Sequence, residues 1–397
     1  MGEARELLAL LVLFLTYLGL GVGYLPGYRM NRAGIALVGA ASLILLGVLD
    51  LEAAWRALDP NTLVFLFGVM VLNAQLGYAG FFPWATLGLL RLARSPFALL
   101  VLLTYGAGAL SAFFLNDTMA LLLTPLVLEL TRALRLPPLP YLLALAGATN
   151  LGSVATLTGN PQNILVGALS GIPYLDFARA LAPVALLGLA LQVGLLALLF
   201  PETRSLAPLP PLAPFRFRLH RGMLAKGLGV AGLLFLAFLL GYPLAQGALV
   251  AAGVVLFTRR LRSERFFLRV DWELLVMFGG LFMVTEGVRA LSLLDPLRPL
   301  AGTPLGLLLT AVLLSNLVSN VPAVLLLAPL VEDQKGWLLL AGASTLAGNL
   351  TLLGSVANLI VAEAARRAGE RVSFWDHLRF GLPLTLLSLG VLYLFLF

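Results

Sequence analysis

The chain has 397 residues, of which 60% are hydrophobic and only 11% are charged, and its mean hydropathy is +0.99. A soluble domain carries about 25% charged residues, so the composition excludes a soluble enzyme and indicates an all-α polytopic membrane protein. The net charge of +7 does not indicate nucleic-acid binding, because the arginines lie in short loops between apolar runs, where they orient helices in a membrane.

The first half of the chain, residues 1–200, is predicted to cross the membrane five times. Its apolar segments include a run at 97–134 that carries the polar triplet LND at 115–117 in its middle, which predicts a re-entrant hairpin. The segment 141–168 is too long for one straight crossing, and Gly159 and Pro161 should interrupt it, so we expect a broken helix. The five predicted crossings are 7–24, 33–50, 61–79, 141–168 and 180–200, with 81–94 along the surface.

A Pro-rich connector at 201–223 leads to a second half, 224–397, that repeats this plan. Residues 110–127 and 314–331 are identical at 9 of 18 positions, and residues 146–166 and 341–361 at 9 of 21. The second half is therefore predicted to contain five crossings as well, at 224–241, 243–258, 272–289, 337–362 and 380–397, with a re-entrant hairpin at 304–333 and a broken helix at 337–362.

Loop charge predicts the orientation of the two halves. If the connector lies in the cytoplasm, 20 of the 26 basic residues fall on the inside, as the positive-inside rule requires. Both termini are then outside the cell inner (plasma) membrane. Four crossings separate 61–79 from its partner 272–289, so the partners run in opposite directions. The repeat is therefore predicted to be inverted, which is the construction of many secondary transporters.

Four polar stretches interrupt the apolar segments: the hairpin tips at 115–117 and 318–320, and the breaks at 150–163 and 345–358. Broken helix ends expose N–H and C=O groups that can bind a small solute and an ion. A single polar residue such as Ser153 or Asn73 is expected only to mediate helix packing. The candidate binding residues are Asn116, Asp117, Thr118, Asn150, Thr156, Thr158, Gly159, Asn160, Asn163, Ser319, Asn320, Thr345, Asn349, Thr351, Gly354, Ser355 and Asn358.

Asp117 is the only acidic residue at a hairpin tip, and its counterpart in the second half is Val321. The repeat therefore does not require a carboxylate there for packing. An ionisable group inside a membrane domain is costly to leave charged and unpaired, and is a functional candidate by default. We expect Asp117 to bind and release the proton or sodium ion that drives transport.

Other chemistries find little support in the residues. The chain has no cysteine, so disulfides and thiolate metal sites are excluded. The two histidines, His220 and His377, are predicted to be solvated loop residues and no metal site is expected. No GxxxxGK[ST] loop occurs, so transport would draw on an ion gradient.

The paired tips, the ATLTGNPQN break and the inverted halves resemble the ion transporter superfamily over nearly the whole chain. This superfamily includes arsenite permeases, D-type sodium/proton antiporters and divalent anion/sodium symporters. The resemblance implies that hairpin tips and broken helices form the substrate and ion sites between a moving transport domain and a scaffold. It also allows a sodium ion at the tips and a homodimer. It implies no other cofactor, and arsenite efflux would bring a soluble ATPase partner.

The stretch FLNDTMALLLTPLV resembles the arsenite permease branch, where Asn-Asp precedes a Thr-Pro. Divalent-anion symporters carry a Ser-Asn-Thr tip in both halves, whereas here the tips are Leu115-Asn116-Asp117 and Ser319-Asn320-Val321. The Asp117 carboxylate would repel a dianion, but it need not repel neutral arsenous, silicic or boric acid.

The sequence thus predicts a secondary transporter, not an enzyme, that works by alternating access with proton-coupled efflux of a small oxy-solute such as arsenite. The alternatives are a sodium/proton antiporter and a sodium-coupled inorganic anion or dicarboxylate symporter. A substrate-gated channel is an alternative of another class, but two broken-helix half-sites favour a carrier.

Overall fold

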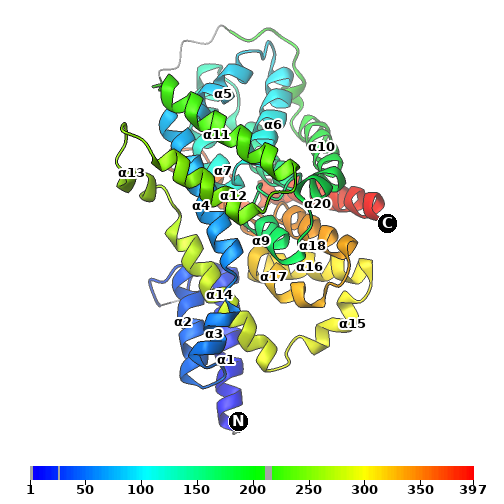
Figure 1. Ribbon diagram of the computed structural model, residues 1–397. Coiled ribbons are helices and arrows are strands. Elements are labelled where there is room, and N and C mark those ends of the chain that lie inside the picture. Colours follow the sequence, from blue (N-terminus) through cyan, green and yellow to red (C-terminus); the bar gives the residue numbers. More distant parts are fainter. Residues whose placement is uncertain (1–2, 26, 211–216) are drawn as a thin grey trace.

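The structure, a computed structural model, describes residues 3–25, 27–210 and 217–397. Within these residues every regular element is a helix, which confirms the predicted all-α class. The elements follow a similar order in the two halves of the chain (Figure 1). In that view α4 leads up towards α5, whereas α14 leads down towards α15.

The helices of the first half are α1 (Glu3–Val22), α2 (Arg32–Leu45), α3 (Leu51–Ala57), α4 (Pro60–Ala79), α5 (Phe81–Leu90), α6 (Pro96–Phe113), α7 (Asn116–Ala133), α8 (Pro138–Ser153), α9 (Pro161–Ser170) and α10 (Tyr174–Leu199). Those of the second half are α11 (Arg221–Leu239), α12 (Leu244–Leu256), α13 (Ser263–Phe267), α14 (Trp272–Ala290), α15 (Arg298–Ala301), α16 (Pro304–Val318), α17 (Asn320–Leu327), α18 (Gln334–Ala347), α19 (Val356–Arg367) and α20 (Phe374–Leu396). Short 3-10 helices lie at Pro201–Arg204, Asp295–Leu297, Ala328–Leu330 and Leu352–Gly354.

Side-chain caps set where many of these helices begin. Asp59 accepts a hydrogen bond from the Thr62 N–H at the start of α4, and Asp271 accepts one from the Leu274 N–H at the start of α14. Such caps satisfy N–H groups that have no partner within a helix. The two caps are 212 positions apart, so α4 and α14 start at equivalent places in the two halves.

Two bundles, which we call the scaffold, each combine helices from both halves of the chain. In one bundle α14 packs on α2, which packs on α1, and in the other α4 packs on α11 and α12. A Cβ added to Gly68 would lie 2.5 Å from the Ala248 backbone, and one added to Gly280 would lie 2.7 Å from the Ala36 backbone. Both glycines therefore allow close approach of two helices. Gly68 and Gly280 are 212 positions apart, and so are Ala36 and Ala248, so the two contacts are equivalent in the two halves.

The remaining long helices form what we call the core. The pair α6–α7 and the pair α16–α17 are the predicted hairpins, and they pack against the broken helices α8–α9 and α18–α19. The helices α10 and α20 pack against each other and join the two halves of the core. The breaks fall at 154–160 and 348–355, inside the predicted stretches, and the hairpin tips lie where α7 and α17 begin.

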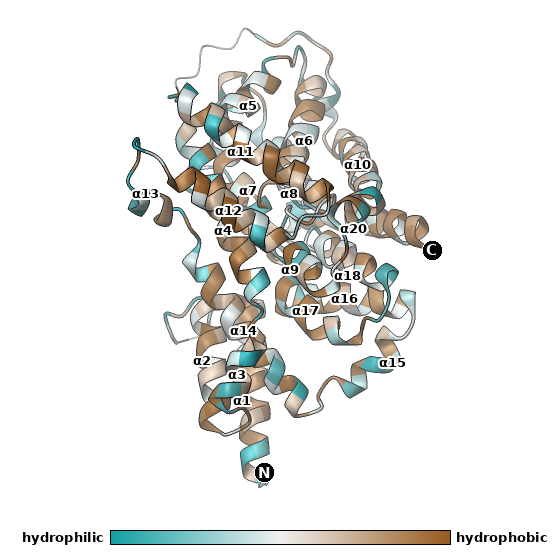
Figure 2. Cartoon of the chain, in the orientation of Figure 1, coloured by the Kyte–Doolittle hydropathy of each residue, from teal (hydrophilic) through white to brown (hydrophobic). Residues whose placement is uncertain are grey.

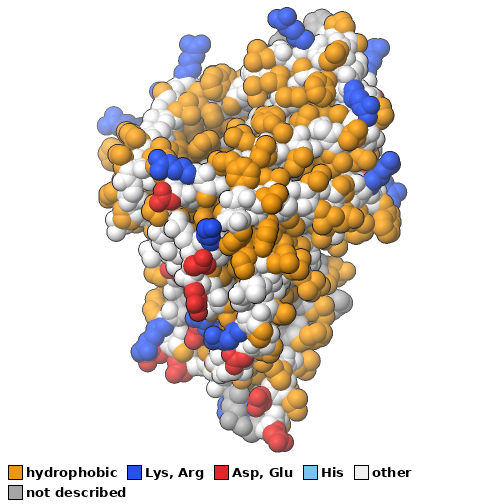
Figure 3. Space-filling view, turned by 90° about the vertical axis from the view of Figure 1, so that its right-hand side faces the viewer, with side chains coloured by type: hydrophobic (Ala, Val, Ile, Leu, Met, Phe, Trp, Pro, Cys, Tyr) orange, Lys and Arg blue, Asp and Glu red, His pale blue; other side chains and the backbone are white. Residues whose placement is uncertain are grey.

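In the described residues, six helices are long and apolar enough to cross a membrane: α1, α4, α6, α10, α11 and α20. A seventh results if α14 and Asp295–Ala301, which meet at 86°, are counted together. Hydrophobic residues cover most of the helical surface in Figure 2, while hydrophilic residues gather in the loops. On the face in Figure 3 hydrophobic side chains cover much of the surface, with single basic side chains in the upper part and acidic and basic ones gathered in the lower part. These features are typical of an integral membrane protein.

Two predicted crossings begin earlier than expected. The helix α10 starts at Tyr174 and not at 180, and α20 starts at Phe374 and not at 380. Both contain an internal proline, Pro183 and Pro383. At α20 the earlier start is fixed by a capping box between Ser373 and Asp376, which satisfies two N–H groups at once. Part of the predicted connector, 211–216, lies outside the described residues.

Candidate functional site

Each broken helix is held together by one asparagine. The Asn163 side-chain amide donates to the Ser153 carbonyl at 2.9 Å and to the Thr156 carbonyl at 3.0 Å. The Asn358 amide donates at the same intervals in the second half, to the Gly348 carbonyl at 2.8 Å and the Thr351 carbonyl at 3.2 Å. These bonds satisfy carbonyls that the breaks leave without helical partners.

The second half of each broken helix begins at a capped N-terminus. Asn160 accepts a hydrogen bond from the Asn163 N–H at 2.8 Å at the start of α9, and Ser355 accepts one from the Ala357 N–H at 3.2 Å at the start of α19. Gly159 lies directly before the first cap, and a Cβ there would lie 2.3 Å from the Ser153 carbonyl oxygen. Only glycine fits this turn without displacing backbone.

Asn150, at the last turn of α8, connects the two halves. Its amide nitrogen donates to Asn349 Oδ1 at 2.8 Å and to Asn358 Oδ1 at 3.1 Å. Its amide oxygen accepts from Ser355 Oγ at 3.0 Å and from Asn116 Nδ2 at 3.2 Å. Asn150 thus links the first hairpin tip to the second break through a fully used side chain.

Thr345, the counterpart of Asn150 in α18, makes the reciprocal connection. Its hydroxyl accepts from Asn160 Nδ2 and Gln162 Nε2, both at 3.2 Å, and donates to Asn163 Oδ1 at 3.4 Å. Each half therefore reaches into the break of the other half. A network whose members satisfy one another in a low dielectric fixes one arrangement of the two breaks.

The hairpin tips carry two asparagines whose amide oxygens have no partner. The Asn116 N–H donates to the Gly159 carbonyl at 2.9 Å, which fixes the first tip against the first break. Asn116 and Asn320 are only 4% and 9% exposed, and the Oδ1 atom of each is buried without a hydrogen-bond partner. An unsatisfied buried acceptor costs about 1–3 kcal/mol. The same unmet atom at both tips makes Asn116 and Asn320 the candidate contacts for a ligand.

The second tip also stores backbone strain. Ser319, immediately before α17, has φ 82° and ψ 159°, a conformation that non-glycine residues rarely adopt. Strain of this kind costs about 1–3 kcal/mol and is found preferentially at functional sites.

The two tips and the two breaks face one cavity of about 430 Å³, which we call the central cavity. Four helices begin at its wall, because the first residues of α7, α9, α17 and α19 all line it: Asn116, Pro161, Asn320 and Val356. A helix N-terminus carries a partial positive charge and N–H donors. The cavity wall is therefore rich in hydrogen-bond donors.

Charged side chains of both signs also line the central cavity. Asp117 comes from the first tip, Arg32 from the start of α2, and Asp271 and Glu273 from the start of α14. Arg32 and Asp271 both act electrostatically on the Asp117 carboxylate. Among the ion pairs of the described residues, none involves Asp117. Asp117 is thus an ionisable group without a fixed partner.

A second pocket of about 310 Å³, the outer pocket, lies between scaffold and core at the far end of α9. A Cβ added to Gly167 of α9 would lie 3.3 Å from Leu244 of α12, so scaffold and core are in contact there. Scaffold residues of the outer pocket have counterparts 212 positions away that line the central cavity. The pairs are Asn61 and Glu273, Phe65 and Met277, Pro243 and Asn31, Leu244 and Arg32, and Ala245 and Ala33.

The structure divides the predicted site residues into two groups. Those that line the central cavity are Asn116, Asp117, Ser319, Asn320 and Ser355, and Thr118 lines a neighbouring cavity. The others shape and hold the breaks behind the cavity wall: Asn150, Thr156, Thr158, Gly159, Asn160, Asn163, Thr345, Asn349, Thr351, Gly354 and Asn358.

Sequence reasoning missed the scaffold contribution to the cavity. Arg32 had been counted only as a positive charge of an inside loop, and Asp271 and Glu273 precede an apolar run without any motif of their own. Gln162, by contrast, lies within the NPQN stretch and could have been included. The scaffold residues come from segments distant in sequence, so only the packing of α2 and α14 identifies them.

The prediction for His377 was wrong. This residue is 0% exposed, and its Nε2 atom lies 3.0 Å from the Asn349 carbonyl oxygen at the second break. The early start of α20 brings it there, since His377 belongs to the first turn of that helix. His220 is exposed, as predicted. In the described residues, no group of three or more His, Asp or Glu side chains could hold a metal ion.

The comparisons with known proteins agree with this architecture. The "Silicon efflux transporter LSI3" of Oryza sativa is 30% identical over 92% of both chains, and the "Putative transporter arsB" of Dictyostelium discoideum is 23% identical over 90% of this chain and 86% of its own. The YdaH transporter of Alcanivorax borkumensis matches the fold with a TM-score of 0.58 at 18% identity, over 99% of this chain and 96% of that one. Residues 11–336 match the family described as CitMHS, citrate transporter. The chain therefore belongs to the CitMHS family of membrane transporters, within the ion transporter superfamily.

Proposed function

We propose that the protein exports a small uncharged oxy-acid, arsenous or silicic acid, in exchange for protons, and that it works by alternating access. The observation that carries this proposal is the central cavity. Four helix N-termini and two partnerless amide oxygens, those of Asn116 and Asn320, meet there beside the carboxylate of Asp117.

A small polyhydroxy acid matches this set of groups. Its O–H groups can donate to Asn116 Oδ1 and Asn320 Oδ1, and its oxygens can accept from N–H groups at the helix N-termini. Since arsenous and silicic acids are mainly uncharged at neutral pH, they bring no charge to be desolvated. The name of the rice relative, a silicon efflux transporter, supports the same class of solute.

The charge of the cavity argues against citrate, although the family is described as citrate transporters. Three carboxylates line it, from Asp117, Asp271 and Glu273, against the single guanidinium of Arg32. Like charges repel strongly where water is scarce. To overcome this repulsion, a polyanion would have only the Arg32 guanidinium and the partial charges of the helix N-termini.

The test is transport by the purified protein in liposomes. Arsenite, silicic acid, citrate and sulfate would each be offered under an imposed proton gradient and, separately, a sodium gradient. We expect arsenite or silicic acid to accumulate under the proton gradient and citrate not to accumulate under either. Citrate or sulfate accumulation under a sodium gradient, with no movement of the neutral acids, would overturn the proposal.

The two pockets support alternating access. In the outer pocket, scaffold residues lie beside Gly167 and Ala168 of α9. In the central cavity, the equivalent scaffold residues lie beside Ser355, which caps α19, and Leu359 of α19. A spacing of 195 positions relates the two breaks, so Gly167 and Ala168 correspond to 362 and 363. If the two sides exchange arrangements during transport, the core shifts along the scaffold by about four to eight residues, or roughly 6–12 Å at ~1.5 Å per residue.

Cysteine cross-linking tests this movement, because the chain has no cysteine of its own. Ala168 and Ala245 line the outer pocket together, and their counterparts are Glu363 and Ala33. We expect the pair Ala168→Cys and Ala245→Cys to cross-link in the present state. The pair Ala33→Cys and Glu363→Cys should cross-link only after the central cavity has closed.

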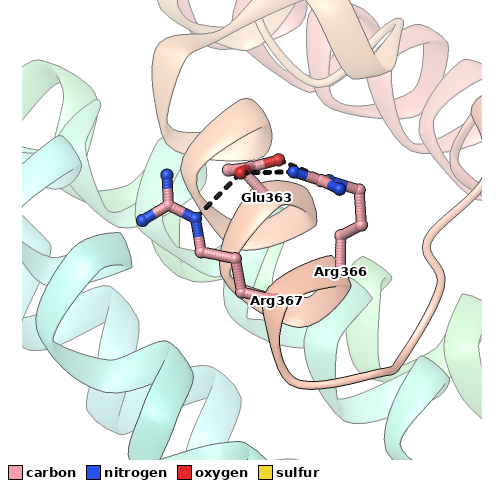
Figure 4. A network of polar contacts seen from close by, with 3 residues as sticks. All are labelled: Glu363, Arg366 and Arg367. Atoms are coloured by element: carbon pink, nitrogen blue, oxygen red, sulfur yellow. Dashed lines mark hydrogen bonds and ion pairs between the residues drawn. The ribbon is translucent and has the colours of Figure 1, made fainter.

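Glu363 is suited to this substitution. Its carboxylate is held only by the neighbouring Arg366 and Arg367 at the end of α19, both at 2.8 Å (Figure 4), and exposed ion pairs of this kind add little stability. Either cross-link should stop transport until it is reduced, and substrate should change the two yields in opposite directions. Equal yields under all conditions would contradict the proposed shift.

A further inference from the structure

A separate cavity of about 270 Å³, which we call the side cavity, adjoins the first hairpin tip on its scaffold side. Its polar lining comes from Asn73 of α4, Asp117 and Thr118 of α7, and Arg269 and Asp271 before α14. Asp117 also lines the central cavity. This carboxylate therefore forms part of the wall of two cavities, and the proposed substrate site accounts for only one of them.

Asn73 is the second observation that points to a ligand. It is 6% exposed, and neither atom of its side-chain amide has a hydrogen-bond partner among the described residues. Its neighbour Gln75 on the same helix donates to the Met223 carbonyl at 3.0 Å, so partners are available to amides on α4. Burying an amide without partners is costly. The expectation that Asn73 only mediates helix packing therefore does not explain its chemistry.

The side cavity offers hard oxygen donors to a cation. These are the carboxylates of Asp117 and Asp271, the hydroxyl of Thr118 and the amide oxygen of Asn73. The guanidinium of Arg269 lies 5.1 Å from the centre of the Tyr78 ring, which holds it at the edge of the set by a cation–π contact. Two carboxylates and one guanidinium leave a net charge of −1, which matches a monovalent cation.

We propose that the side cavity binds the small monovalent cation, hydronium or sodium, that drives transport. This inference rests on the proposed function, because it assigns the coupling step of that transporter to a place. The cation reaches Asp117 from the side cavity while the substrate occupies the central cavity. Arg32, which lines the central cavity together with Asp117, acts electrostatically on the same carboxylate and favours its charged form once the cation is released.

In the described part of the chain, the tip of the second hairpin lines the central cavity and not the side cavity. The counterpart of Asp117 is Val321, which lines the central cavity alone among the described pockets. The two halves thus share the tip asparagines, but only the first half carries the carboxylate. We infer that the substrate site uses both halves and that the cation site belongs to the first.

The experiment compares Asn73→Leu and Thr118→Val with a matched control, Thr285→Val. Thr285 is also buried with a partnerless hydroxyl, but it lies on α14 and lines neither cavity. Cation dependence would be measured in liposomes in two arms, varying sodium at fixed pH and varying pH without sodium. Exchange of arsenite at equal cation concentration on both sides would be measured in parallel.

We expect both side-cavity variants to raise the half-saturating concentration of the driving cation by about tenfold. Such a change corresponds to the loss of one cation ligand that contributes ~1.4 kcal/mol to binding. Exchange should fall much less, and the control should behave as wild type. The arm that shifts identifies hydronium or sodium. An unshifted cation dependence in both arms would overturn the inference. A fall in arsenite exchange as large as the change in cation dependence would also overturn it, since Asn73 and Thr118 would then belong to the substrate site.

The proposed function can fail separately. If wild-type protein accumulates no substrate under any gradient, the transporter proposal fails. Cation binding at the side cavity would still be measured through the thermal midpoint of the purified protein. Sodium chloride, with choline chloride as control, or a change of pH should then raise that midpoint in wild type and not in Asn73→Leu. No difference between the two proteins would overturn the site as well.

Discussion

Replacing Asp117 with asparagine should abolish proton-driven accumulation of substrate while exchange of substrate continues. Asparagine keeps the shape of the side chain, but it cannot take up or release a proton. A carboxylate without an ion-pair partner, in the wall of two cavities, is the group best placed to couple the two fluxes. The measurement is the accumulation ratio in liposomes under a fixed proton gradient.

The matched control is Glu129→Gln, which removes an exposed carboxylate from the same helix, α7. It should leave both accumulation and exchange as in wild type. Loss of exchange together with accumulation in Asp117→Asn would mean that the carboxylate only holds the tip against α19. Accumulation at the wild-type ratio and with the wild-type pH dependence would show that Asp117 is not the coupling group.

Alanine at either tip asparagine should reduce the rate of substrate exchange by more than about tenfold. Asn116 and Asn320 each lose an amide whose oxygen is free for a ligand, and one hydrogen bond to a ligand contributes about 1–3 kcal/mol, where ~1.4 kcal/mol is a factor of ten. The double variant should be lower still, since the two side chains approach the solute from opposite halves. Initial rates of exchange as a function of substrate concentration are the measurement.

The two single variants are not expected to be equal in stability. Asn116 also donates to Asn150, so its removal leaves part of the central network unpaired, whereas Asn320 is free of such a bond in the hydrogen bonds of the described residues. Asn116→Ala should therefore lower the thermal midpoint more than Asn320→Ala. Gln334→Ala, at an exposed position that starts α18, is the control. Normal exchange in both folded tip variants would show that the tips are packing elements.

Much of the fold could be predicted because the relevant signals are local. Apolar runs of membrane length, Gly159 and Pro161 within one of them, and polar triplets within two others determine where helices form and stop. The match between Asn116 and Asn320, and between Asn163 and Asn358, appears directly in the sequence repeat. The same reasoning placed His377 in a loop, because the residues around it are hydrophilic and lie before the apolar part of α20.

The sequence by itself determined that this is a helical membrane transporter with two hairpin tips and two broken helices. The reason is that backbone N–H and C=O groups in lipid must be hydrogen-bonded within helices, so polar interruptions of apolar helices are found only inside the protein or beside a cavity. Only the tertiary structure decided which polar residues line the central cavity. It placed Asn150 and Thr345 in the network between the breaks, and left the oxygens of Asn116 and Asn320 free. It also brought Arg32 and Asp271 from the scaffold to Asp117, because contacts between segments hundreds of residues apart depend on helix packing and leave no local pattern in the chain.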